Sequence, residues 1–157
     1  MGYQIIAEGI ANKQVTNAIF DKRDYEETFF RDLVEANKEV VISSPRLNRY
    51  KVGKVISFLK SRQESGVCVT LITMSPETVG YEDTIELRLL IDSLQKEGIV
   101  VRTTCEYSEC FAVIDKIIVW HGGMNLLGNA YEGDNLIRIE NTQAAEELLE
   151  ITDQLLK

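Results

Sequence analysis

The side chains best suited to chemistry gather between residues 108 and 125. Ser108 and Cys110 offer a hydroxyl and a thiol, and His121 is the only histidine of the 157-residue chain. An imidazole can act as a nucleophile or a proton carrier near neutral pH, whereas a serine hydroxyl needs a base beside it. His121 therefore has two interpretations: a substitute nucleophile or acid, or a strand-end residue that packs locally.

The same stretch predicts a β-hairpin. Two apolar runs, residues 111–114 and 117–120, lie on either side of the polar pair Asp115 and Lys116. This spacing is typical of two buried strands joined by a tight turn. The turn would place the carboxylate of Asp115 at one end of the hairpin.

A pair of glycines follows the second apolar run. Gly122 and Gly123 can adopt positive φ, so the chain can turn sharply there and approach a ligand closely. The two strands would then position the side-chain amide of Asn125 just past the turn.

This pattern resembles the signature of the phospholipase D superfamily. That signature is His, any residue, Lys, four residues and Asp, followed about six residues later by Gly-Gly or Gly-Ser, any residue and Asn. The matching positions are Asp115, Gly122, Gly123 and Asn125. The chain departs from the signature at the two reactive positions, where Ser108 replaces the histidine and Cys110 replaces the lysine.

The resemblance implies a separate role for each motif residue at the site. In the family the motif histidine is the nucleophile, the lysine binds the phosphate oxygens, and a second copy of the motif supplies the histidine that protonates the leaving group. This chain carries one copy, so a family-type site requires two chains that meet about a two-fold axis, and we expect a homodimer. Loss of a single preorganised group of this kind costs roughly 10²–10³ in rate, and here both positions differ.

Three functions follow from the resemblance. The first is a catalytically degenerate binding or assembly module with a protein partner in a nuclease or helicase system. The alternative is an active, metal-independent phosphodiesterase or nuclease that uses His121 or an intact partner chain. The third is a small-anion or nucleotide sensor that uses Arg46 and the glycine turn.

A second group of candidate ligand-binding residues follows the strand expected at residues 39–43. Ser44 and Arg46 come directly after this strand, at the edge where open α/β sheets bind ligands. Arg46 also begins the one basic cluster of an acidic chain, which comprises Arg46, Arg49, Lys51 and Lys54. We expect Arg46 to be either an anion contact or a solvated loop arginine.

Strand and helix patterns alternate along the chain. They predict one α/β domain over residues 1–157, with a mixed, mostly parallel sheet flanked by helices on both faces. The first twenty residues predict one or two short strands. The later elements are expected to be a helix over 24–37, strands over 39–43, 67–73 and 99–102, helices centred on 52–59 and 85–94, the hairpin, a strand over 135–140 and a C-terminal helix.

Composition restricts the partners. The net charge of −8 weakens a general nucleic-acid interaction, since such binding is driven by cationic residues that meet phosphates. Three cysteines without a Cys-x-x-Cys pair predict neither a disulfide framework nor a metal site, and we expect no cofactor. No apolar run is long enough to predict a membrane span. A reducing cytoplasm is the simplest compartment.

Overall fold

The computed structural model describes residues 17–106 and 109–156. In this part of the chain, seven strands form one sheet with the order β1-β7-β6-β5-β2-β3-β4. The elements are β1 (Ala18–Asp21), α1 (Tyr25–Val34), β2 (Glu39–Ser43), α2 (Arg49–Glu64), β3 (Cys68–Met74), η1 (Pro76–Thr78), α3 (Tyr81–Lys96), β4 (Val100–Thr104), β5 (Cys110–Ile114), β6 (Ile118–Gly122), β7 (Asn135–Glu140) and α4 (Thr142–Leu155).

The sheet is mixed, as predicted, but its parallel part is smaller than expected. Among the described strands, only the β2–β3 and β3–β4 pairs are parallel. The hairpin β5–β6 and the strands β7 and β1 extend the sheet with antiparallel pairs. The βαβ crossovers account for the two parallel pairs, whereas the two-residue hairpin turn forces its strands to be antiparallel.

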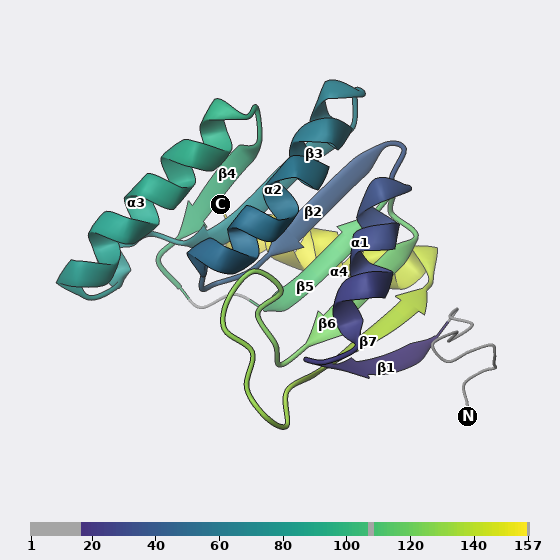
Figure 1. The fold of residues 1–157 in the computed structure, drawn as a ribbon. Coiled ribbons are helices and arrows are strands. Elements are labelled where there is room, and N and C mark those ends of the chain that lie inside the picture. Colours follow the sequence, from purple (N-terminus) through teal and green to yellow (C-terminus); the bar gives the residue numbers. More distant parts are fainter. Residues whose placement is uncertain (1–16, 107–108, 157) are drawn as a thin grey trace.

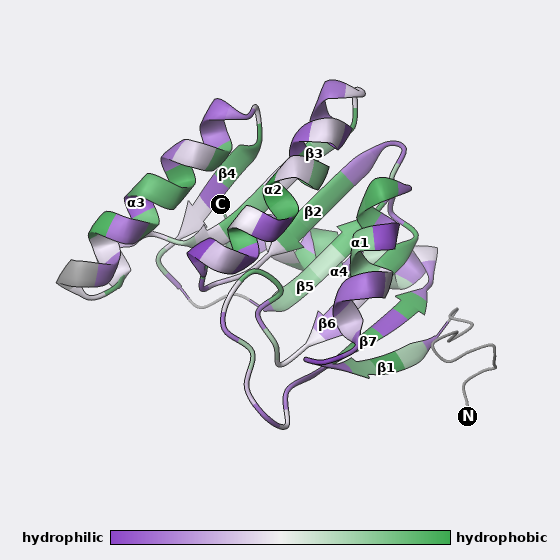
Figure 2. Cartoon of the chain, viewed as in Figure 1, coloured by the Kyte–Doolittle hydropathy of each residue, from purple (hydrophilic) through white to green (hydrophobic). Residues whose placement is uncertain are grey.

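Helices cover both faces of the sheet (Figure 1). Helices α1, α2 and α3 pack on one face, and their apolar side chains form the larger core with inward residues such as Ala112 and Trp120. Helix α4 packs on the other face against a smaller core that includes Val41, Phe111 and Val119. The central strands are therefore apolar on both faces. Figure 2 shows apolar residues along most of β2 and β5.

Several predicted boundaries agree closely with the structure. The strands expected at 39–43 and 135–140 have the predicted ends. Gly66 and Gly98, which follow α2 and α3, adopt φ of +92° and +86°. Such left-handed residues end helices because glycine adopts this region without steric cost. The strand at Ala18–Asp21 overlaps the end of the first predicted region, whose residues 1–16 fall outside the described residues.

A buried ion pair connects α1 to β7, in the antiparallel part of the sheet. Arg138 donates two hydrogen bonds of 2.8 Å to the carboxylate of Asp32, one from Nε and one from an amino group. The indole N–H of Trp120 donates a third, of 2.7 Å, to the same carboxylate. The side chains of Arg138 and Asp32 are only 6% and 5% exposed, so this cluster is part of the core.

Candidate functional site

The predicted hairpin is confirmed, with its tight turn at the two residues expected. Asp115 and Lys116 both have a φ of 57°, and the N–H of Ile117 donates to the carbonyl of Ile114 at 3.1 Å. Left-handed residues at both central positions define a type I′ turn, which matches the twist of a two-stranded hairpin.

The carboxylate of Asp115 is hydrogen-bonded to backbone N–H groups. It accepts hydrogen bonds from the N–H groups of Asn37, Lys38 and Glu39 at 2.9, 2.7 and 3.0 Å. Partial burial opposes ionisation, but these three donors outweigh it and lower the pKa of Asp115 below its usual value. Asp115 therefore lies at the start of β2, at the opposite end of that strand from Ser44.

The position of the motif lysine is occupied by a buried thiol. Cys110 begins β5, is 2% exposed, and lies opposite Gly122 in the register of the hairpin. A neutral thiol in this position provides no fixed positive charge for a phosphate. Ser108, at the histidine position, lies outside the described residues.

His121 lies on the other face of the sheet from Cys110. It pairs with Phe111, which belongs to the core beneath α4, whereas its neighbour Trp120 packs on Phe20 and Phe29 on the α1 side. Because side chains alternate along a strand, Cys110 faces the α1 side and His121 faces the α4 side. This placement favours the interpretation of His121 as a strand-end residue.

The glycine turn has a different basis from the one predicted. Neither Gly122 nor Gly123 has a φ in the left-handed region. A Cβ at Gly122 would instead lie 2.2 Å from the carbonyl oxygen of Asn135, while one at Gly123 would meet nothing within 4 Å. Gly122 is thus needed where β6 and β7 approach closely.

We expect Gly122→Ala to lower the free energy of unfolding by about 2–3 kcal/mol, because the added methyl group must displace the backbone of β7. Gly123→Ala is the matched control and is expected to change it by less than about 1 kcal/mol. Urea denaturation followed by circular dichroism measures both. Equal effects of the two substitutions would contradict this account of Gly122.

Ser44, Arg46 and Asn125 are brought together at the carboxyl end of β2, although Asn125 is 79 residues from Arg46 in the chain. The side-chain oxygen of Asn125 accepts from the backbone N–H of Arg46 at 3.1 Å. The hydroxyl of Ser44 donates to the carbonyl of Arg46 at 2.7 Å and accepts from the N–H of Leu127 at 3.2 Å. These bonds join the loop after β2 to the loop after β6.

A cavity of about 550 Å³ lies beside this junction, between the two loops and α3. We call it the acidic pocket, since two carboxylates and one arginine contribute to its wall. Its polar side chains include Arg46, Asp83, Glu86, Asn125, Asn129 and Tyr131. Of the residues predicted to bind a ligand, Arg46 lines it, Ser44 is hydrogen-bonded to Arg46, and Gly122 and Gly123 are not among its lining residues. Asn125, the last residue of the signature, also lines it.

A second cavity, of about 500 Å³, adjoins the acidic pocket at the same loops. We call it the basic pocket because three lysines, Lys22, Lys51 and Lys54, contribute to its wall. Lys51 and Lys54 belong to the basic cluster recognised in the sequence, but Arg46 lies in the acidic pocket instead. The two pockets share Asn48 and Asn129, whose side chains are hydrogen-bonded to each other at 2.6 Å.

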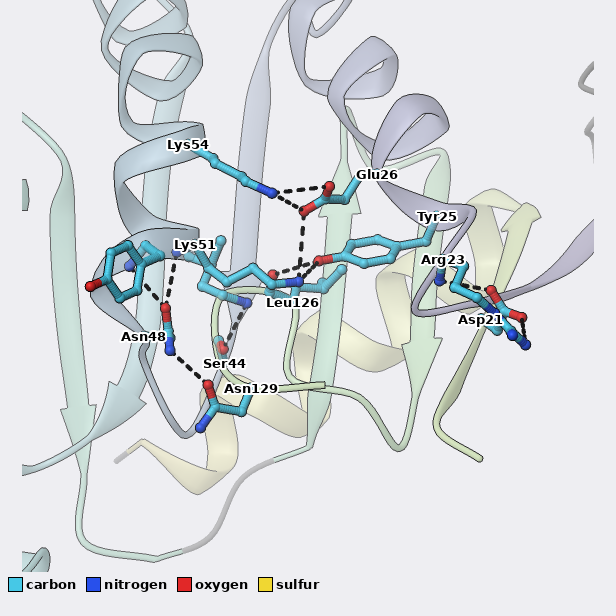
Figure 3. A network of polar contacts seen from close by, with 12 residues as sticks. Asp21, Arg23, Tyr25, Glu26, Ser44, Asn48, Lys51, Lys54, Leu126 and Asn129 are labelled. Atoms are coloured by element: carbon cyan, nitrogen blue, oxygen red, sulfur yellow. Dashed lines mark hydrogen bonds and ion pairs between the residues drawn. The ribbon is translucent and has the colours of Figure 1, made fainter. Parts of the chain in front are cut away.

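A polar network holds Lys51 and Lys54 of the basic pocket in place (Figure 3). The ammonium of Lys51 donates to the hydroxyl of Tyr25 at 2.7 Å and pairs with Glu26 at 3.6 Å. Burial, reinforced by the charge of Glu26, raises the pKa of Tyr25, so this phenol stays protonated. Its hydroxyl in turn contacts the carbonyl of Leu126 at 3.4 Å, which links α1 to the loop after β6.

Sequence reasoning missed several residues of these pockets. Asn48 caps α2, because its side chain accepts from the backbone N–H groups of Tyr50 and Lys51. The Asn that precedes an apolar helical pattern could have indicated this cap. Nothing local pointed to Asp83 or Asn129, since they line the same cavity as Asn48 only through the folding of distant segments.

Two absences concern the described part of the chain only. No cluster of three or more His, Cys, Asp or Glu side chains there could hold a metal ion. None of the helices there has the length and apolar character needed to cross a membrane.

Comparison with known proteins defines the class. Residues 29–156 match the family described as cardiolipin synthase, PLD-like domain. The chain therefore belongs to the phospholipase D superfamily, as the signature predicted. No curated protein matches the chain at a significant level.

Solved structures share the fold. Nuc from Salmonella typhimurium, a phospholipase D family member, superimposes with a TM-score of 0.71 at 16% identity, over 88% of this chain and 92% of its own. NucT from Helicobacter pylori gives a TM-score of 0.69 at 19% identity, over 89% and 94% of the two chains. TrmBL2, an archaeal chromatin protein, gives 0.64 at 9% identity, over 94% and 52%.

Proposed function

We propose that this chain is a catalytically degenerate phospholipase D-like domain that acts as a binding or assembly module. The observation that carries the proposal is Cys110, a neutral thiol that is 2% exposed, at the position where the family motif has its lysine. A transition state that accumulates charge on phosphate needs a preorganised cation, and Cys110 supplies none.

The position of His121 also supports a non-catalytic role. A substitute nucleophile would have to reach the phosphate on the side of the sheet that Cys110 faces. His121 belongs to the opposite face, where its strand neighbours are Phe111 and Ile137. The alternative enzyme would therefore depend on an intact partner chain that contributes its own histidine and lysine.

The proposal includes a homodimer and a protein partner. One copy of the signature per chain favours association of two copies about a two-fold axis. The net charge of −8 favours a protein over naked nucleic acid as the further partner. A partner in a nuclease or helicase system is consistent with the known context of the superfamily.

Hydrolysis of bis(4-nitrophenyl) phosphate without added metal tests the proposal. We expect no turnover above the buffer rate for the wild-type chain, and light scattering on the same sample should give the mass of a dimer. His121→Ala is the informative variant, because it leaves Cys110 and the pocket residues intact. Turnover that His121→Ala abolishes would overturn the proposal in favour of the enzyme.

A further inference from the structure

The acidic and basic pockets adjoin each other, and we call the two together the groove. Asn48, Asn129 and Tyr131 line both cavities, so a ligand that lies across these three residues would contact the two together. Each cavity falls within the range of roughly 300–1,000 Å³ that is usual for small-molecule sites. The two halves differ in charge, so a ligand that fills both must have an anionic group at one end and hydrogen-bond donors at the other.

The basic half suits an anion. Lys51 and Lys54 share the single carboxylate of Glu26 at 3.6 and 3.4 Å, while Lys22 pairs with Glu132 at 3.2 Å. Positive charge therefore exceeds negative charge at this end of the groove. A phosphate group would gain charge-assisted hydrogen bonds from the ammonium groups there.

The acidic half suits hydrogen-bond donors. Asp83 and Glu86 form neither an ion pair nor a hydrogen bond with another residue in the described part of the chain, and both line the cavity. Because they lie on the first turns of α3 with Leu87 and Leu90, the same wall offers carboxylate acceptors and apolar surface. A flat ring with N–H groups on its edge matches this combination.

We propose that the groove binds a nucleoside monophosphate, with the phosphate in the basic pocket and the base in the acidic pocket. Guanine fits best, since its adjacent ring N–H and amino groups can donate together to one carboxylate. Tyr131, whose side chain is 63% exposed, lies where the halves meet and offers a ring for stacking. The inference rests on the proposed binding role and names its ligand class.

Calorimetric titration of the full chain with guanosine monophosphate, guanosine and inorganic phosphate tests this assignment. We expect the nucleotide to bind about tenfold more tightly than phosphate or the nucleoside alone, because each of these occupies only half of the groove. Asp83→Asn should weaken nucleotide binding about fivefold or more. Asp92→Asn, an exposed carboxylate further along α3, is the matched control and should leave it unchanged.

Two charge variants test the phosphate end. Lys54→Ala should weaken binding of the nucleotide about threefold to tenfold and leave guanosine unaffected. Its matched control is Lys60→Ala on the same helix, since Lys60 is similarly exposed and paired with Glu97. Glu26→Gln should strengthen nucleotide binding, because it removes the anion that competes for Lys51 and Lys54.

The outcomes separate this inference from the proposed function. Absence of nucleotide binding, equal affinity for inorganic phosphate, or equal effects of Lys54→Ala and Lys60→Ala would each overturn the nucleotide site. Turnover of a phosphodiester bears on the degenerate role alone, since it is measured with a different substrate.

Discussion

Replacement of Asp32 by Asn is expected to lower the free energy of unfolding by about 3–5 kcal/mol. The carboxylate accepts three hydrogen bonds, two from Arg138 and one from Trp120, and it is 5% exposed. The substitution leaves the buried guanidinium without its counter-charge. Glu140, at 3.0 Å from Arg138, retains one ion pair but is itself 40% exposed, so it compensates only in part.

Chemical denaturation at neutral pH measures this loss. Asp153→Asn is the matched control: it removes the same charge from an exposed pair with Arg102 and should change stability by less than about 1 kcal/mol. In the double variant Asp32→Asn with Arg138→Met, part of the loss should be recovered, because no uncompensated charge remains buried. A cost below about 1 kcal/mol for Asp32→Asn would contradict the role given to this ion pair.

Replacement of Asp115 by Ala is expected to cost about 3 kcal/mol, because it removes an ionised acceptor from three backbone N–H groups. Alanine is also strained at a φ of 57°. Asp115→Asn tolerates this backbone conformation and keeps one acceptor oxygen, so it should cost less than Asp115→Ala. Asp115 thus stabilises the junction between the hairpin and β2, although it matches a residue of the catalytic signature.

The lowered pKa of Asp115 gives this contribution a definite pH dependence. The folded state has the lower pKa, so the stabilisation is complete above the unfolded pKa, which is near 4, and it decreases as pH falls through the folded pKa. Urea titrations between about pH 7 and about pH 3 should show the difference between wild type and Asp115→Asn shrinking at the acidic end. A difference that is constant over this range would mean that the charge of Asp115 contributes nothing.

The candidate site was predictable in part. Ser44 and Arg46 follow a short β-branched run, and the ends of such strands are common ligand sites, so their position could be inferred. Asn125 was indicated by the signature. The pairing of Asn48 with Asn129 was not predictable, because residues so far apart in sequence meet only when α2 and the loop after β6 pack together.

Local patterns determined much of this protein. The alternation of apolar and polar residues set the strands, Asp115 and Lys116 set the hairpin turn, and Gly66 and Gly98 ended two helices, since these features depend on neighbours in the chain. The signature likewise indicated the family and the loss of its reactive pair.

Only the tertiary structure decided how these parts meet. It determined that β5 pairs antiparallel with β2, so that four of the six strand pairs in the described part of the chain are antiparallel. It placed His121 and Cys110 on opposite faces, and it made Gly122 necessary through the carbonyl of Asn135 rather than through φ. The physical reason is that strand order and close backbone contacts join segments distant in sequence, so no local pattern encodes them.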